Sequence, residues 1–523
     1  MGGLNELTAF VSQIVTILSV PQNWFILIGA SLLGIVFGAL PGLTATLGVG
    51  LLATLTYGVG YQTALIALIA LYVGAIYGGS YPAILLNIPG TAASAASAMD
   101  GYPMSARGEG GRALGLTTTA SFIGTLFGML ALALLSPLIV EAALGFTSYE
   151  YFLLALFGIL ISGTLQSPDL VVKGWIAGFI GMALSVIGRD PLMYYPRYTF
   201  DQPALDQGLE VVPVLIGAFA IPQIITTLSS RAPLAVTQVR DRVVPAIGTV
   251  VKNIRHIIRS AAIGIGIGAI PGVGEDIAGW VSYGTAKSTS RHPETFGTGE
   301  PAGLVSAETA NNACIGGALI PLVTLGIPGS PPAVMLLGAL MLHGLTPGPM
   351  LSISNPTFIA ELAAIMVLAS TAMCINGLLL AKQVVRVLAV PTEIFLPVVA
   401  VLSVLGSYAL GLNIENLYLM LLVGLGAYLL TIMKYPIAPL VIGVILGPMA
   451  DENLRRALMV GQGNLSGFVE RPISVILILA TSSLVVAQVP AVRRAFGRLR
   501  PRASTGGDAP AAGPAPAMEK DVK

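Results

Sequence analysis

Four proline–glycine pairs interrupt apolar stretches of this sequence, and small or hydroxylated residues follow them. Proline ends a helix because it lacks an N–H group, whereas glycine lets the chain bend and lets a ligand approach the backbone. A helix that begins after such a break points free N–H groups into the gap, which suits a carboxylate. Packing kinks are the alternative explanation. The pattern predicts an anion site formed by Pro41, Gly42, Thr44, Thr46, Asn87, Pro89, Gly90, Thr91, Pro271, Gly272, Gly274, Pro328, Gly329 and Ser330.

Side-chain amides and acids lie near the same breaks, and Glu308 stands one turn before a pair of asparagines. Buried amides must be hydrogen-bonded, and amide, carbonyl and carboxylate oxygens coordinate hard cations. Two alternatives stand beside this reading. The amides can join helices by hydrogen bonds, and the acids can lie in water at a membrane boundary, since Lys287 and Arg291 follow. The predicted cation ligands are Asn87, Glu275, Asp276, Asn311 and Asn312.

Motifs for catalysis are absent from the sequence. It contains no GxxxxGK[ST], HExxH or GxSxG pattern, and its three histidines are far apart. The two cysteines lie in apolar stretches and imply no disulfide framework. We therefore expect no enzyme, no cofactor and no structural metal. Any dependence on ions should come from a coupling ion, Na⁺ or H⁺, with Na⁺ favoured by the amide-rich breaks.

Composition places the chain in a membrane. Of 523 residues, 55% are hydrophobic and only 10% are charged, against roughly 25% in soluble domains. The net charge of +1 gives no reason to expect nucleic acid as a partner. We predict an all-α polytopic protein with about eleven to thirteen crossings, and re-entrant hairpins at 82–99 and 321–343. The predicted spans are 22–40, 60–80, 114–140, 149–165, 169–188, 210–228, 256–271, 304–325, 357–380, 391–410, 415–433, 436–450 and 472–489, with a marginal helix at 4–20.

The chain contains two related halves. GALPGL at 38–43 returns as GAIPGV at 268–273, PAILLNIPG at 82–90 as PLVTLGIPG at 321–329, and PVLIGAFAIP at 213–222 as PLVIGVILGP at 439–448. Three matches in the same order favour an internal duplication. The predicted organisation is a short helix (1–21), membrane repeat 1 (22–229), a basic cytoplasmic linker (230–255), membrane repeat 2 (256–457), an extra transmembrane helix (458–490) and a disordered basic tail (491–523).

Basic residues give the expected orientation. They concentrate in 229–259 and in the tail, which the positive-inside rule makes cytoplasmic, whereas the acidic loop 189–210 is expected outside. With these loops assigned, matching helices of the two halves run in opposite directions. Inverted repeats with broken helices are the sequence pattern of a secondary transporter whose binding site lies where the repeats meet.

The sequence resembles the large membrane subunit of the tripartite tricarboxylate transporters, the TctA family. The resemblance covers roughly residues 10–490. It rests on FGALPGLTATLG at 37–48, YGGSYPAILLNIPGTAASAASAMDGYPM at 77–104, GAIPGVGEDIAGW at 268–280 and TLGIPGSPPAVMLLGALMLHGLTPGPM at 324–350. It implies a small four-helix membrane subunit and a periplasmic solute-binding protein as partners, and a carboxylate as substrate. Gly326 stands where the first copy has Asn87, so the two breaks are not expected to bind identically.

The expected function is cation-coupled import of tri- or dicarboxylates or related organic acids across a bacterial inner membrane by alternating access. The alternatives are a stand-alone organic-anion carrier, a channel and, from another class, an intramembrane enzyme. Gly90 and Gly329 are expected to reject bulky side chains because the ligand approaches the backbone there, while the mutant protein stays folded.

Overall fold

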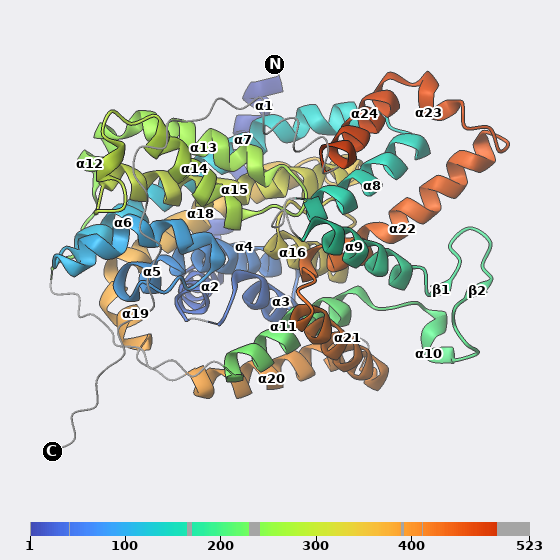
Figure 1. Ribbon diagram of the computed structural model, residues 1–523, viewed down its shortest axis with the longest axis horizontal. Coiled ribbons are helices and arrows are strands. Elements are labelled where there is room, and N and C mark those ends of the chain that lie inside the picture. The colour runs from blue at the N-terminus through green and yellow to red at the C-terminus, as the bar shows by residue number, and fades with distance from the viewer. Residues whose placement is uncertain are drawn as a thin grey trace.

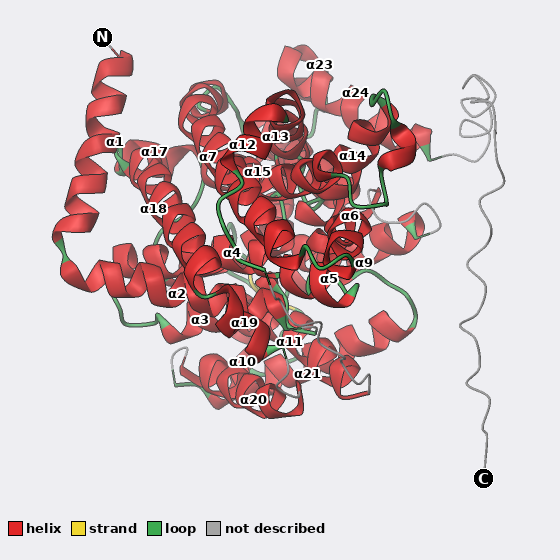
Figure 2. Cartoon of the chain, turned by 90° about the vertical axis from the view of Figure 1, so that its left-hand side faces the viewer, coloured by secondary structure: helices red, strands yellow, loops and turns green. Residues whose placement is uncertain are grey.

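The computed structural model describes residues 2–40, 42–164, 170–229, 241–388, 392–409 and 412–488, and the regular structure in them is almost entirely helical (Figures 1 and 2). Pro41, residues 230–240 of the predicted basic linker and the predicted tail 491–523 lie outside the described residues. The helices are α1 (Gly2–Ser19), α2 (Pro21–Ala39), α3 (Ala45–Leu55), α4 (Tyr61–Gly78), α5 (Ser80–Leu86), η1 (Ala92–Ser94), α6 (Ala95–Ala106), α7 (Gly110–Ala143), α8 (Ser148–Thr164), α9 (Val171–Ser185), α10 (Pro203–Asp206), α11 (Val211–Ser229), α12 (Ile247–Lys252), α13 (Ile254–Gly268), α14 (Glu275–Ser288), η2 (Pro293–Thr295), α15 (Pro301–Leu325), α16 (Pro331–Leu342), α17 (Pro349–Ser354), α18 (Phe358–Leu379), α19 (Ala381–Val387), α20 (Thr392–Ala409), α21 (Ile414–Ile432), α22 (Ile437–Val460), α23 (Gly467–Glu470) and α24 (Pro472–Ala487).

The predicted fold class is confirmed. In the described part of the chain, seven helices are long and apolar enough to cross a membrane, and seven shorter helices are also apolar. Every predicted span coincides with a helix. The largest difference is α22, which continues to Val460 instead of ending at 450. Its polar last turns stay helical because Arg455 and Arg456 pair with Asp451 and Glu452 one turn earlier.

Backbone-to-backbone packing joins α2 to α4 and, in the same way, α13 to α15. A Cβ atom on Gly34 would lie 2.2 Å from the carbonyl oxygen of Leu71, and one on Gly264 would lie 2.2 Å from that of Ala310. Only glycine allows helices to approach so closely. Both α4 and α15 are buried along nearly their whole length, so they form the centre of the molecule.

The chain reverses direction at the first and third proline–glycine pairs. Leu71 of α4 lies against Gly34, before the first break, and also against Gly48, after it, so α3 runs back beside α2. Arg259, near the start of α13, donates to Thr289 just after the end of α14 at 2.5 Å, so α14 returns beside α13. The helix pairs α2–α3 and α13–α14 are therefore hairpins.

At the second and fourth pairs the chain steps back: it returns along the preceding helix for about two turns, and the next helix then continues in the original direction. Ser80 of α5 and Ser97 of α6 both donate to the carboxylate of Glu308, and Ile84 lies against Gly101, so α5 and α6 run in the same direction. Likewise, Gly329, just before α16, donates to Ala318 of α15, and Gly348, beyond the end of α16, donates to Val323, so α16 runs in the same direction as the last turns of α15. The predicted re-entrant hairpins at 82–99 and 321–343 are therefore wrong, and the chain reverses at the first and third pairs instead. The local sequence signals that a helix is interrupted, but it does not signal the direction of the helix that follows.

The last helix of each half packs in the other half. Helix α22 packs on α8 and α9, and α11 packs on α20 and α21. The contacts again involve glycine: a Cβ on Gly443 would lie 2.0 Å from the carbonyl oxygen of Gly178, and one on Gly217 would lie 2.3 Å from that of Met420. Because each of these two helices packs on helices of the other half, the two halves of the chain are interlocked.

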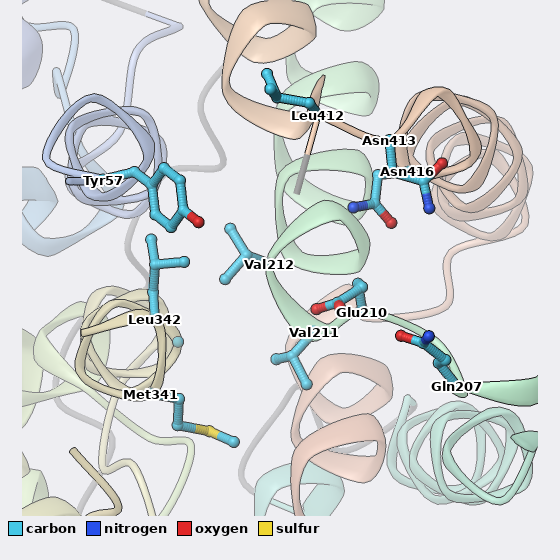
Figure 3. Close-up of a pocket in the computed structure, with 11 residues that line it drawn as sticks. Tyr57, Gln207, Glu210, Val211, Val212, Met341, Leu342, Leu412, Asn413 and Asn416 are labelled. Atoms are coloured by element: carbon cyan, nitrogen blue, oxygen red, sulfur yellow. The ribbon is translucent and has the colours of Figure 1, made fainter. Parts of the chain in front are cut away.

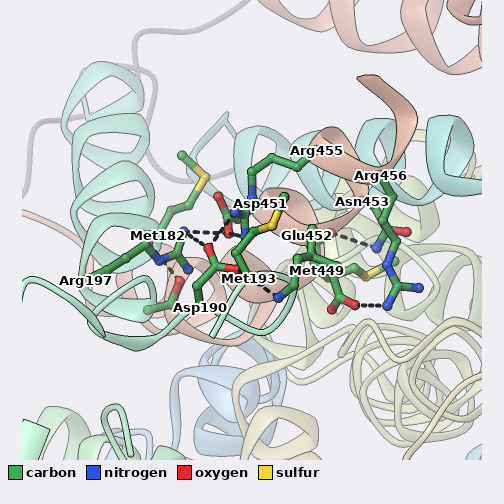
Figure 4. Close-up of polar contacts among 12 residues, drawn as sticks. Met182, Asp190, Met193, Arg197, Met449, Asp451, Glu452, Asn453, Arg455 and Arg456 are labelled. Carbon is green, nitrogen blue, oxygen red and sulfur yellow. Dashed lines mark hydrogen bonds and ion pairs between the residues drawn. The ribbon is translucent and has the colours of Figure 1, made fainter. Parts of the chain in front are cut away.

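An ion-pair cluster fastens a protruding loop to the end of α22 (Figure 4). The loop contains the two-stranded sheet of β1 (Gly188–Arg189) and β2 (Pro196–Arg197). Asp190 accepts from Arg455 at 2.5 Å, and Arg197 pairs with Asp451 at 2.9 Å. The hydrogen bond from Arg455 holds the pKa of Asp190 below its ordinary value, and the backbone N–H groups of Met193 and Leu192 lower this pKa further.

Replacing Asp190 by Asn should lower the melting temperature of the purified protein near neutral pH. A carboxylate whose folded-state pKa is depressed stabilises the fold above its unfolded pKa of about 4, and this stabilisation is lost as the pH falls through its folded value. The gap between wild type and Asp190→Asn should therefore be constant from pH 7 to about pH 5 and should shrink below pH 4. Thermal melting in detergent measures it. Asp201→Asn, at an exposed position of the same loop, is the control; an unchanged gap at pH 3 would contradict the assignment.

Candidate functional site

The third and fourth breaks meet around a buried tyrosine. Tyr72 of α4 donates to the carboxylate of Glu275 at the start of α14, and its hydroxyl lies 2.7 Å from that of Ser330 at the start of α16. The N–H of Gly274 donates to the carbonyl oxygen of Gly329 at 3.1 Å. All these side chains are buried. The structure thus brings two helix N-termini of the second half against a helix of the first half.

The predicted hydroxyl residues cap the helices that follow the breaks. Thr44 accepts from the N–H of Leu47 at 3.1 Å, and Ser330 accepts from that of Ala333 at 3.4 Å. Thr91 and Ser94 form a capping box at the start of η1. These side chains fix where each helix begins, as N-cap residues do. Thr46, in the first turn of α3, is buried as well.

Gly90 and Gly329 are required for backbone packing. A Cβ on Gly90 would lie 2.1 Å from the carbonyl oxygen of Gly38, and one on Gly329 would lie 2.0 Å from that of Gly268. Their N–H groups donate to Gly79 and Ala318, at 3.3 and 3.4 Å. The predicted intolerance to larger side chains therefore has a packing cause at both positions. The expectation that such variants stay fully folded conflicts with this geometry.

The other predicted residues are distributed unevenly. Gly42 and Gly272 have positive φ angles of 94° and 77°, as the turns at the first and third breaks require. Pro271 and Pro328 are buried, whereas Pro89 is exposed and Pro41 lies outside the described residues. Of the predicted cation ligands, Glu275, Asn311 and Asn312 are buried, but Asp276 and Asn87 are exposed. In the described residues no hydrogen bond joins Asn87 to the other four.

A second buried polar cluster surrounds Glu308 on α15. Its carboxylate accepts from Ser80 at 2.5 Å, from Ser121 at 2.8 Å and from Ser97. The amide nitrogen of Asn312 donates to Ser121 at 2.8 Å. Glu308 is not among the predicted cation ligands, and none of the three serines is among the predicted site residues. The only local signal was an acid one turn before two asparagines, because the serines come from three separate segments.

A pocket of about 780 Å³ opens between α3, α11, α16 and α21 (Figure 3). Polar side chains from Tyr57, Gln207, Glu210, Asn413 and Asn416 line it, together with apolar residues of α11 and α16. None of the predicted site residues lines this pocket, so it is separate from the cluster around Tyr72. It lies at the end of the molecule that carries the loop 186–210, since Gln207 and Glu210 belong to that loop.

Comparison with known proteins gives one family. The sequence profile of the family described as "Tripartite tricarboxylate transporter TctA family" matches residues 24–442. An "Uncharacterized 52.8 kDa protein in TAR-I ttuC' 3'region" of Agrobacterium vitis is 34% identical over 467 residues, covering 88% of this chain and 92% of that protein. An "Uncharacterized protein in TAR-II ttuC' 3'region" of the same organism is 33% identical over 228 residues, covering 43% of this chain and 94% of that protein. No solved structure matches significantly.

Alanine at Gly90 or Gly329 should destabilise the protein. The added methyl group would collide with a backbone carbonyl, and overpacking of this kind costs about 1–3 kcal/mol or more. Melting curves of the purified variants measure the effect. Gly29→Ala is the matched control, because nothing lies within 4 Å of a Cβ at that helical position. A Gly90→Ala protein as stable as Gly29→Ala would contradict the packing role.

Proposed function

Because the chain belongs to the tripartite tricarboxylate transporter TctA family, we propose that it is the large transmembrane subunit of a cation-coupled importer of tri- or dicarboxylates or related organic acids. The substrate is proposed to bind at the paired breaks. The observation that carries the proposal is the meeting of α14 and α16, whose N-termini lie together at Tyr72, Glu275 and Ser330. Helix N-termini attract carboxylates through unpaired N–H groups and the helix dipole.

Alternating access is proposed from the repeated architecture. The α2–α4 contact of the first half has its match in the α13–α15 contact of the second, and each half contains one hairpin and one stepped break. The crosswise packing of α11 and α22 supports the same proposal. Inverted repeats of this kind place a substrate site between two elements that can expose it to either side.

Cation coupling is proposed because acidic and amide side chains are buried near the breaks. Glu275, Asn311 and Asn312 are buried, and in the described residues no salt bridge involves Glu275. A buried carboxylate needs a compensating charge, which a coupling ion supplies. Na⁺ is the proposed ion and H⁺ the alternative.

The proposed partners are a periplasmic solute-binding protein and a small four-helix membrane subunit. The word "tripartite" in the family description supports further subunits. The proposed location is a bacterial inner membrane with the C-terminal tail in the cytoplasm. A stand-alone organic-anion carrier is the second candidate, and a channel the third; uptake without the binding protein would favour the carrier.

Uptake into proteoliposomes tests the function. With a panel of carboxylates and the binding protein, the wild type should show saturable counterflow and gradient-driven uptake that needs Na⁺ or H⁺ but no nucleotide. Ser330→Ala should reduce the apparent affinity about two- to tenfold, because it removes the cap of α16 and the hydrogen bond to Tyr72 that hold the proposed site in place, and one hydrogen bond is worth roughly 0.5–1.5 kcal/mol. Ser136→Ala, a buried serine on α7, is the control. Undiminished uptake after both ion gradients are collapsed would overturn the coupling.

Membrane topology is tested by cysteine labelling. In a background without Cys314 and Cys374, a cysteine at Gln202 should react with an impermeant reagent from the periplasm. A cysteine at Ser229 should react only from the cytoplasm, because α11 separates the two positions. Both residues are exposed, so failure to label cannot be ascribed to burial. Labelling from one side would overturn the inverted orientation of the repeats.

A further inference from the structure

The carboxylate of Glu308 is a buried charge without a cationic partner. The residue is fully buried in the middle of α15, and in the described part of the chain no lysine, arginine or histidine lies within ion-pair distance of it. Three serine hydroxyls solvate the carboxylate but carry no positive charge. Removing an uncompensated charge from water is costly, so this site calls for a counter-charge.

The hydrogen-bond pattern favours a metal cation over a proton as that counter-charge. Ser80 and Ser97 donate to one carboxylate oxygen and Ser121 to the other, which is the arrangement that suits an ionised group. A proton on the carboxyl oxygen that accepts from Ser121 would weaken that oxygen as a hydrogen-bond acceptor. A cation leaves the group ionised and uses the lone pairs that the hydroxyl oxygens retain.

A free acceptor stands next to the same group. Asn312 lies one turn after Glu308, and its amide nitrogen donates to Ser121 and to the carbonyl oxygen of Glu308. Its amide oxygen is buried and accepts no hydrogen bond. Buried polar atoms are rarely left unsatisfied, and an amide oxygen is a good ligand for a hard cation.

We propose that Glu308 and Asn312 of α15, with Ser80, Ser97 and Ser121, form a binding site for a Na⁺ ion. One carboxylate and four neutral oxygens match a monovalent ion in both charge and ligand type. A multivalent metal has no comparable site here, because the described residues contain no group of three or more histidine, cysteine or acidic side chains that could hold one.

The site would couple ion binding to the second break. Ser80 and Ser97 stand on either side of the segment 87–90, whereas Ser121, Glu308 and Asn312 belong to α7 and α15. An ion held by all five residues fixes α5 and α6 against α7 and α15. This step rests on the proposed cation-coupled transport, while the ion site itself does not.

Binding of ²²Na⁺ to the purified full-length protein tests the site. The wild type should bind Na⁺ saturably, Glu308→Gln should lose the Na⁺ ion held at this site and so bind one ion fewer per protein, and Ser97→Ala should weaken binding at this site at least tenfold. Two matched controls should bind within twofold of the wild type: Glu361→Gln, a buried acid on α18, and Ser136→Ala, a buried serine on the same helix as Ser121. Gel filtration confirms that each variant is folded, and Ser97→Ala removes only one hydroxyl group.

Wild-type affinity in Glu308→Gln, or no Na⁺ binding by the wild type, would overturn the proposal. The proposal would also be overturned if the wild type bound no Na⁺ but released a proton, and Glu308→Gln released none. That outcome would assign the site to H⁺. Carboxylate counterflow is measured separately. Na⁺ binding through Glu308 without carboxylate counterflow would support this site and reject the proposed transport. Na⁺-driven uptake that Glu308→Gln leaves unchanged would support the proposed transport and reject this site.

Discussion

A broken helix in an apolar environment must satisfy the backbone groups that the break exposes, and this constraint shapes the centre of the molecule. At the second break, Gly90 and Ile88 donate back to Gly79 and Pro82. At the fourth break, Gly329 and Ile327 donate in the same way to Ala318 and Pro321. Each unpaired group would cost several kcal/mol in hydrocarbon. The chain therefore steps back along its own helix, and glycine is needed because the returning segment touches another backbone.

The same constraint determines which groups remain for a ligand. Thr44, Thr91 and Ser330 are engaged as caps, so the donors available to an anion are the backbone N–H groups in the first turns of the following helices. Glu275 lies at one of these helix starts. An anion bound there would face a carboxylate, and like charges at close range repel strongly in a low dielectric. If the proposed function holds, anion binding at this centre and a requirement for a cation would be two consequences of one arrangement.

The local sequence was sufficient to predict where the helices lie, but it was insufficient to predict the direction in which each helix runs. The spans were predictable because apolar length and proline–glycine breaks are local signals. Whether the chain reverses, as at Gly272, or steps back, as at Gly329, depends on contacts with α8, α15 and α22 that only the fold supplies. Glu308 illustrates the same limit. Its neighbours Ser80, Ser97 and Ser121 lie about 190 to 230 residues away in sequence, so no spacing rule connects them.

Two kinds of contact divide the molecule into a centre and two peripheral groups of helices. Within the central helices, and within the groups α8–α9–α22 and α11–α20–α21, glycines meet backbone atoms, as Gly124 meets Thr309 and Gly443 meets Gly178. At three glycines that face these groups from the centre, the nearest atoms belong to side chains: Thr227 at Gly42, Ser162 at Gly272 and Leu215 at Gly338. Side chains change rotamer easily, whereas close-packed backbones form rigid units. Because α11 and α22 have exchanged places, each peripheral group contains helices of both halves. A displacement of the breaks relative to these groups would then separate these side-chain contacts and leave close glycine contacts such as Gly124–Thr309 and Gly443–Gly178 intact.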